Sequence, residues 1–112
     1  KEAILKFGRM YFRETSKNGL DFQFPDCEEC LLAFSRILHE GEILIVYNSS
    51  PKDAKEEYIA IDTTINKEGM LMECIYGNKK KTRIEKNRDQ EADRFFIKVK
   101  LKPMEFLIFK NK

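Results

Sequence analysis

The first sixteen residues carry a hydrophobic pattern typical of an amphipathic helix. Apolar or small side chains recur at i, i+3, i+4, i+7 and i+8, while lysine and arginine occupy positions between them. The pattern stops at Thr15-Ser16-Lys17-Asn18-Gly19, where Asn and Gly readily adopt the left-handed conformation that closes a helix. We therefore predict one helix over residues 2–16, within a terminal segment 1–19. Its apolar stripe consists of Ile4, Phe7, Gly8, Tyr11 and Phe12.

Residues 20–30 break this periodicity and predict an ordered connecting loop. Pro25 and the acidic residues interrupt the segment, although Leu20, Phe22 and Phe24 alternate with polar positions. We expect the aromatic side chains of this loop to tuck under a neighbouring element.

From Leu31 onward the period changes to that of β-strands, with short apolar runs bounded by turn residues. His39-Glu40-Gly41-Glu42 predicts a hairpin turn after the first run, and the second run is apolar on both faces, which indicates a central strand covered on both sides. Residues 78–93 are polar, with Thr82 and Ile84 as the only signs of a short edge strand before a mobile loop. The runs are LLAFSRIL, EILIVYN, EYIAIDT, MLMECIYG, RFFIKVKLK and MEFLIFK.

This order of elements predicts a mainly β protein. A β-sandwich or barrel fits it far better than an α/β fold, because no helical pattern separates the strands. We expect an antiparallel Greek-key β-sandwich of about six to eight strands over residues 31–112, preceded by the single helix.

Composition narrows the class of protein without naming a partner. The 112 residues suffice for one domain, and 42% hydrophobic content with a net charge of +2 is typical of a folded chain that is neither disordered nor strongly basic. We expect no nucleic-acid partner and no membrane partner, since no apolar run approaches the ~20 residues of a membrane span. Lys1 is not an initiator Met, so both termini can be cuts in a longer protein, and the compartment stays open between cytoplasm and secretion.

Acidic residues give no clear catalytic pair. A glycosidase needs two carboxylates ~5–10 Å apart across a cleft, whereas the candidates here are near neighbours in loops or at strand ends. A solvated charged surface is the favoured interpretation. The candidates are Glu28 and Glu29, Glu56 and Glu57, and Asp89, Glu91 and Asp93.

Nucleophilic and metal chemistry have equally little support. The single His39 lies in a predicted turn, with no Gly-x-Ser-x-Gly motif elsewhere in the chain. Cys27 and Cys30 have zinc-knuckle spacing, but only Cys74 and His39 remain to complete four ligands. We expect these cysteines to be small apolar residues, and we predict neither a cofactor nor a metal.

A basic cluster and a set of tyrosines are two further candidates for ligand binding. Lys79-Lys80-Lys81, Arg83, Lys86 and Arg88 form a basic cluster, but acidic residues dilute it and no aromatic is interleaved as a base-stacking platform. A solvated loop is the favoured interpretation of this cluster. Separately, Tyr47, Tyr58 and Tyr76 could stack on a sugar ring if they face outward, although most aromatics on apolar strands belong to the core.

The order of three motifs resembles the end of an α-amylase-family glycoside hydrolase. They are ILKFGRMYFRETSKNG, then DFQFP, then LAFSRILHEGEILIVYNSS. In that family the last helix of the catalytic (β/α)8 barrel, of the form LRYGRxYxRxIS, leads through a loop into an all-β C-terminal domain that begins much like ILAWSRILxxxEVLVVxN. The resemblance covers Ile4 to about Ser50, with weaker support from EYIAIDTTIN, CIYGN and the turn at Leu101-Lys102-Pro103.

The resemblance implies a non-catalytic domain. The family's catalytic carboxylates and calcium ligands lie upstream of Lys1, so no catalytic, cofactor or metal residue has a counterpart here. The implied partner is the missing catalytic barrel of the parent chain, which this domain stabilises, with weak α-glucan contact as a further role. If unpartnered, the helix is expected to pack on the chain's own sheet or to mediate a dimer. The barrel-interface candidates are Ile4, Phe7, Tyr11, Phe12, Phe22 and Phe24.

Two alternatives belong to other functional classes. An independent carbohydrate-binding module would need outward-facing aromatics in a line. A nucleic-acid or protein interaction β-barrel would use the basic residues 79–88.

Overall fold

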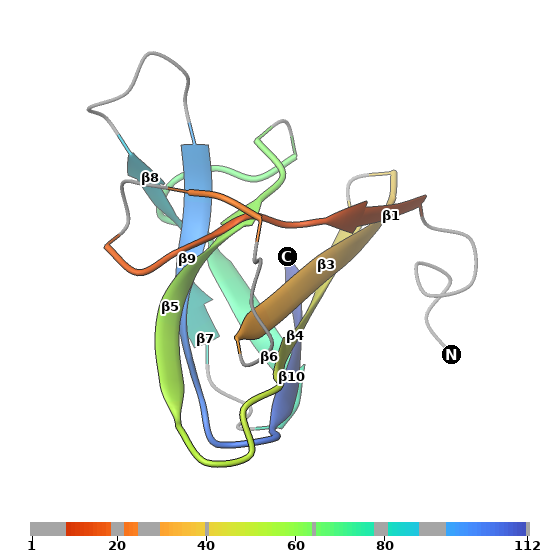
Figure 1. Ribbon diagram of the computed structural model, residues 1–112. Helices are drawn as coiled ribbons and strands as arrows, with labels where there is room; N and C mark the ends of the chain where they lie inside the picture. Colours follow the sequence, from red (N-terminus) through yellow and green to blue (C-terminus); the bar gives the residue numbers. More distant parts are fainter. Residues whose placement is uncertain are drawn as a thin grey trace.

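The computed structural model describes residues 9–18, 22–24, 30–39, 41–63, 65–77, 81–87 and 94–111, with Arg9, Met10 and Asn87 described by their backbone alone. These residues form two antiparallel sheets packed as a sandwich (Figure 1). The first sheet has six strands in the order β1-β3-β4-β10-β6-β7, and the second has four in the order β2-β5-β9-β8. The strands are β1 (Arg9–Phe12), β2 (Thr15–Ser16), β3 (Leu31–Leu38), β4 (Gly41–Asn48), β5 (Lys55–Ile61), β6 (Leu71–Tyr76), β7 (Lys81–Arg83), β8 (Glu85–Asn87), β9 (Arg94–Leu101) and β10 (Phe106–Asn111).

The prediction of an antiparallel β-sandwich is confirmed, but the sheets also include β1 and β2, which precede the predicted start at Leu31. All six apolar runs form strands, although the third begins at Lys55 and ends at Ile61, about two residues earlier than the run EYIAIDT indicated. The hairpin turn is also confirmed, with His39 at a φ of 56° between β3 and β4. Strand β4 pairs with β3 on one side and β10 on the other, so it is a central strand. Leu44 and Val46 on its inner face belong to the core, whereas Ile45 and Tyr47 on its outer face are only half-buried.

The prediction of a helix over residues 2–16 is wrong for the part that the structure describes. Residues 9–12 form β1, which pairs with β3, and residues 15–16 form β2, which pairs with β5 in the other sheet. The local spacing of Tyr11 and Phe12 fits a helix and a short strand equally well, and the long-range pairing decides between them. Figure 1 shows this segment crossing one end of the sandwich from the β3 side to the β5 side. Residues 1–8, which include Ile4 and Phe7, lie outside the described residues.

The core lies between the two sheets and is built from alternate residues of the long strands, as strand geometry requires. In β9, for example, Ile97, Val99 and Leu101 are buried while Lys98 and Lys100 are exposed. The core side chains are Leu31, Ala33, Leu44, Val46, Ile59, Ile61, Met72, Cys74, Ile84, Ile97, Val99, Leu101, Leu107 and Phe109.

A buried polar network ties the crossing segment to the sandwich. Glu42 is fully buried and its carboxylate accepts hydrogen bonds from Arg13 Nη2 at 3.0 Å and Asn66 Nδ2 at 2.7 Å. Arg13 Nε also donates to Ser35 Oγ at 2.9 Å, and Asn111 Nδ2 donates to Asn66 Oδ1 at 3.0 Å. The network therefore fixes the position of the chain between β1 and β2.

The expectation that the aromatics of residues 20–30 tuck under a neighbouring element is confirmed for Phe22 and wrong for Phe24. Gln23 pairs with Thr15 through two backbone hydrogen bonds of 2.9 and 3.0 Å. Phe22 is half-buried and packs on Phe96, with ring centroids 5.4 Å apart, whereas Phe24 is exposed. The short strand near Thr82 and Ile84 exists as β7, and Ile84 itself is fully buried just after it.

Candidate functional site

The outer face of the six-stranded sheet carries apolar side chains in rows that run across the strands. Residues opposite one another in adjacent strands point to the same face of a sheet. The register therefore defines two rows on this face. The longer contains Phe12, Phe34, Ile45, Ile108 and Tyr76, and the shorter contains Leu32, Tyr47 and Phe106.

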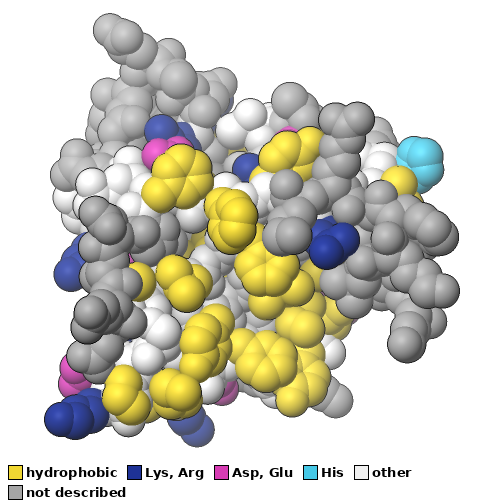
Figure 2. Space-filling view, turned by 45° about the vertical axis from the view of Figure 1, so that its right-hand side comes forward, with side chains coloured by type: hydrophobic (Ala, Val, Ile, Leu, Met, Phe, Trp, Pro, Cys, Tyr) yellow, Lys and Arg dark blue, Asp and Glu magenta, His cyan; other side chains and the backbone are white. Residues whose placement is uncertain are grey.

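Several of these side chains face solvent although they are large and apolar. Phe12 is 73% exposed, Tyr76 is 53% exposed and Phe106 is 42% exposed, while Phe34 and Ile45 between them are half-buried. Figure 2 shows hydrophobic side chains gathered across one face of the molecule, with few charged side chains among them. A contiguous apolar surface of this kind marks a site of interaction more often than a chance arrangement does.

One end of this face carries Phe12 and Phe34, and Phe24 lies next to Phe12 around an adjoining hollow; we call these three residues the junction patch. The rings of Phe12 and Phe34 are 6.4 Å apart, and Phe24 is 59% exposed. Phe12 and Phe24 line a hollow of about 300 Å³. The other residues that line it are Arg13, Glu14, Ala60, Ile61, Asp62, Thr63 and Arg94.

The described barrel-interface candidates therefore lie in three places. Phe12 and Phe24 come together at the junction patch, and the exposed Tyr11 lies on the opposite face of β1 with the Arg13 guanidinium 5.5 Å from its ring centroid. Phe22 instead packs on the four-stranded sheet, where Arg94 lies 5.0 Å from its ring centroid.

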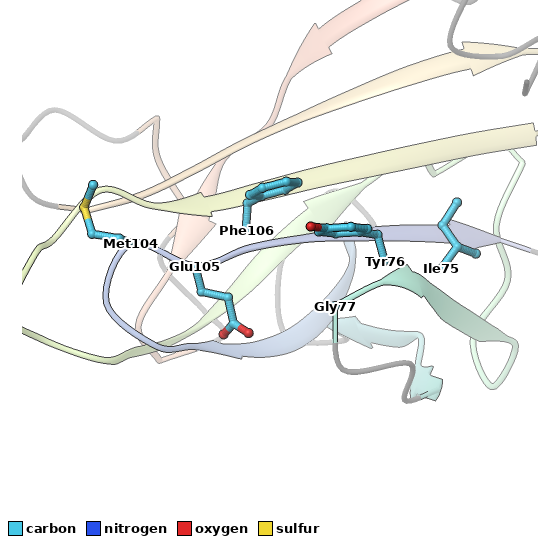
Figure 3. A pocket seen from close by; sticks show the side chains of 6 residues that line it. All are labelled: Ile75, Tyr76, Gly77, Met104, Glu105 and Phe106. Carbon is cyan, nitrogen blue, oxygen red and sulfur yellow. The ribbon is translucent and has the colours of Figure 1, made fainter.

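The other end of the face forms an open pocket of about 640 Å³, which we call the aromatic pocket. The Tyr76 and Phe106 rings stack on each other at its edge, with centroids 4.9 Å apart and planes inclined by 13° (Figure 3). The pocket is lined by Ile75, Tyr76, Gly77, Met104, Glu105 and Phe106. The sequence predicted that Tyr76 could stack on a sugar ring if it faced outward, but it did not predict which residues would lie next to Tyr76 in this pocket. The apolar run MEFLIFK could have predicted that Phe106 faces outward. Alternation along a strand places Phe106 and Ile108 on the face opposite the core residues Leu107 and Phe109.

The acidic candidates do not form a catalytic pair among the described residues. Glu56 is exposed and lies 3.7 Å from Lys98 Nζ, whereas the adjacent Glu57 is buried, so their side chains point to opposite faces of β5. Glu28, Glu29, Asp89, Glu91 and Asp93 lie outside the described residues.

Among the described residues, the cysteines and the histidine do not come together in one site. Cys30 is buried before β3, Cys74 is buried in β6 with its Sγ donating to the Tyr76 carbonyl at 3.0 Å, and His39 is exposed in its turn. No group of three or more His, Cys, Asp or Glu side chains in the described ranges could hold a metal ion. Cys27 lies outside them.

The described basic residues divide between two places. Lys81 and Arg83 of β7 are exposed, and Lys86 of β8 lies 6.0 Å from the Phe95 ring centroid. A second groove, of about 630 Å³, is lined partly by Lys81, Lys98, Lys100 and Lys102. The lysines of β9 alternate with core residues, as on a solvent-facing strand. Within the described part of the chain, no helix is long and apolar enough to span a membrane.

Comparison of the chain with protein-family models, with curated proteins and with solved structures gives no match. The resemblance to the α-amylase family therefore depends on the three ordered motifs within Ile4–Ser50 alone. In the first of these motifs, residues 9–12 and 15–16 form strands and not the helix that the resemblance implies.

Proposed function

We propose that this chain is a non-catalytic C-terminal β-sandwich domain of an α-amylase-type glycosidase that acts on α-glucans. Its role is to pack against the catalytic barrel of the parent chain and stabilise it. The observation that carries this proposal is the exposure of Phe12 and Phe24, at 73% and 59%. Phe12 belongs to the motif that resembles the barrel's last helix, although residues 9–12 of that motif form strand β1 in this chain.

The energetics favour a covering partner for this patch. Full burial of a large apolar side chain contributes about 1.5–3 kcal/mol, so two exposed phenylalanines represent several kcal/mol of unrealised stabilisation. Arg13 and Glu42 hold the chain next to the patch in one position by a buried ion pair of 3.0 Å. An apolar patch next to a segment that is held in one position is suited to a fixed junction with a preceding domain.

Greek-key connectivity is part of the same proposal. Strands β4, β10 and β6 lie side by side although they are far apart in the sequence. Long connections that return a late strand to an early one are the hallmark of such sandwiches.

The direct test is a reducing-sugar assay on starch and maltooligosaccharides. The 112-residue chain is expected to produce no reducing ends, whereas the longer protein that carries the barrel is expected to be active. Turnover by the 112-residue chain alone would overturn the proposal.

The aromatic pocket favours one alternative, a carbohydrate-binding module, over the others. Tyr76 and Phe106 are outward-facing aromatics on adjacent strands, as that alternative requires. A nucleic-acid interaction through residues 79–88 has a different signature, because affinity for phosphates falls steeply with salt.

A further inference from the structure

Strand β9 is paired almost throughout on one side and only in part on the other. On the first side, β5 pairs with all residues from Phe95 to Leu101. On the second side, β8 pairs with Arg94, Phe95 and Phe96 alone. Among the described residues, nothing pairs with residues 97–101 on this second side. The second half of β9 is therefore a free edge of the four-stranded sheet.

Two residues of this free edge direct their backbone groups outward. Along an antiparallel strand, successive residues hydrogen-bond alternately to the neighbour on one side and to the neighbour on the other. The Ala60 N–H donates to the Glu14 carbonyl at 2.9 Å, away from β9, so the opposite residue Phe96 directs its own N–H and C=O toward β8. By the same alternation, Lys98 and Lys100 direct theirs to the free edge. Unpaired backbone groups of this kind are a template for a further strand.

The chain leaves this edge at Ile84, between β7 and β8. The Ile84 N–H donates to the Met70 carbonyl at 2.8 Å, and the Ile84 carbonyl accepts the Gly69 N–H at 2.9 Å. Residues 81–83 pair with β6 in the other sheet. One continuous stretch of chain therefore pairs first with the six-stranded sheet and then, after Ile84, with β9.

Charge disfavours a longer β8 along this edge. If the β8–β9 register continued before Glu85, it would place Arg83 opposite Lys98 and Lys81 opposite Lys100. Like charges directly opposite each other destabilise a pair of strands. The departure of the chain at Ile84 avoids both repulsions, and it leaves the positions opposite the two lysines of β9 unpaired by any described residue.

A groove of about 630 Å³ lies along this edge. Lys81 and Thr82 of β7 line it on one side, and residues 98–100 of β9 line it on the other. Its floor consists of the buried core residues Val99, Leu107 and Phe109. Because this floor is closed, the space beneath an added strand suits small apolar side chains.

The described residues that line the groove carry a positive charge. Lys100 is exposed and has no ion pair among the described residues, and the Lys98 side chain keeps 49% exposure although its Nζ lies 3.7 Å from Glu56. Residues 78–80, which lie outside the described part, are Asn-Lys-Lys in the sequence and add no acidic group. The groove therefore attracts carboxylates. The charged residues that line it are Lys81, Lys98, Lys100, Lys102 and Glu105.

The edge and the groove together specify the partner. In a strand added antiparallel to β9, alternate side chains would lie on the outer face opposite Lys98 and Lys100, and the side chain between them would lie over Val99. Acidic residues suit the outer positions, and a small apolar residue suits the inner one. A second copy of this chain does not suit the edge, because two β9 edges would bring lysines against lysines.

We propose that the free edge of β9 binds an extended segment of a partner protein in which acidic residues alternate with small apolar ones. The segment joins the four-stranded sheet as an antiparallel strand in line with β8, with its carboxylates beside Lys98 and Lys100. Main-chain hydrogen bonds supply the affinity of such strand addition, and alternate side chains supply the specificity. The inference does not depend on the proposed function.

The test is a titration of the 112-residue chain with a blocked seven-residue peptide that alternates glutamate and valine. Backbone amide chemical shifts in NMR spectra report binding. Saturable shifts are expected at residues 96–101 at millimolar peptide. The Kd is expected to rise with added salt, because salt screens the attraction between lysine and carboxylate. A peptide with lysine in place of glutamate is expected not to bind.

Methylated peptides separate strand addition from simple charge attraction. In the proposed pairing, the N–H groups of the peptide's glutamates face β9, whereas those of its valines face away. N-methylation of the glutamates is therefore expected to abolish binding. N-methylation of the valines is the matched control, since it keeps the charge and the bonds to β9, and it should leave most of the affinity.

Substitutions in the chain test the role of the lysines. Lys100→Glu is expected to raise the Kd by a factor of about five to ten, because it replaces an attraction between exposed charges by a repulsion. Lys17→Glu is the matched control. Lys17 is an exposed lysine directly after β2, at the opposite edge of the same sheet, and its substitution should leave the Kd unchanged.

Three outcomes would overturn the inference. The first is the absence of shifts at residues 96–101 at millimolar peptide. The second is equal binding by the lysine peptide or by the peptide that is N-methylated at its glutamates. The third is a shift of the same amides when the concentration of the chain alone is raised, which would assign the edge to a second copy. None of these outcomes affects the proposed packing on a barrel, which the reducing-sugar assay and substitutions at Phe12 test separately.

Discussion

At the scale of single residues, Glu42 shows best how the fold is held together. Its side chain is fully buried, and besides Arg13 and Asn66 it accepts the Asp62 N–H at 3.2 Å, while its own N–H donates to Asn111 Oδ1 at 2.7 Å. The partners come from the chain after β1, the turn after β5 and the last strand. One carboxylate thus joins parts of the chain that are distant in sequence, and no local pattern could reveal it.

We predict that Glu42→Ala strongly destabilises the chain. Removing one partner of a buried ion pair leaves the other without compensation and costs about 3–5 kcal/mol, and the lower end applies because Arg13 retains 16% exposure. Glu56→Ala is the matched control, since its exposed pair with Lys98 is worth about 0–1 kcal/mol. Urea denaturation measures both free energies of unfolding. Equal losses of unfolding free energy in the two variants would show that the Glu42 network stabilises the chain no more than an exposed ion pair does.

Two glycines give a second comparison at this scale. Gly77 has a φ of 118°, and a Cβ there would collide with Leu107 Cδ2, whereas Gly69 has a φ of 89° with open space around it. Both Ala variants carry backbone strain, but only Gly77→Ala also overpacks the core, which typically costs a further ~1–3 kcal/mol. We expect Gly77→Ala to unfold at a clearly lower urea concentration than Gly69→Ala. If Gly69→Ala unfolds at the lower urea concentration instead, the Leu107 side chain can move away from the added methyl group at little cost.

At the scale of elements, period-two alternation predicted the strands well. Strands β3, β4, β6, β9 and β10 follow their apolar runs closely, because each buries one face against the core. Strand β5 begins earlier than predicted, because Lys55 and Glu56 pair across from Leu101 and Lys100. Glu56 shares the exposed outer face with Lys100, whereas Lys55 is half-buried on the side of Leu101.

The segment before Leu31 shows where such patterns fail. A four-residue strand is too short to establish a period, and β1 is defined by pairing with β3 some twenty residues away in sequence. The same limit applies to the candidate sites. Sequence reasoning found Phe12 and Phe24 through a resemblance, but the pairing of Tyr76 with Phe106 depends on β10 returning to lie beside β6.

Strands β1 and β2 are predicted to be essential to the stability of the sandwich. Deleting residues 1–16 removes both strands, leaves Glu42 without Arg13, and uncovers the edges of β3 and β5. The deletion is expected to lower the urea midpoint and to cause aggregation that grows with protein concentration. Deleting residues 1–8 is the control, because every described strand remains. Circular dichroism and light scattering report the two effects, and identical behaviour of both deletions would contradict the prediction.

At the scale of the whole molecule, the six-stranded sheet presents an outer face with two separate ends. The junction patch includes Phe12 of strand β1, and the aromatic pocket lies about 19 Å away from Phe12 by strand spacing. A partner that covers the junction patch therefore need not cover the aromatic pocket. The central claim is that the junction patch is covered in the parent protein.

Thermal unfolding of Phe12→Ser, measured in the 112-residue chain and in the longer parent protein, tests that claim most directly. Phe12 is 73% exposed in the chain, so the substitution should change the Tm of the chain little. In the parent, where we propose that the ring is buried, it should cost about 2 kcal/mol and lower the Tm of the transition that includes this domain by several degrees. Lys100→Ser, on the exposed face of the four-stranded sheet, should affect neither protein. A Phe12→Ser shift of the same size in chain and parent would contradict the proposed junction.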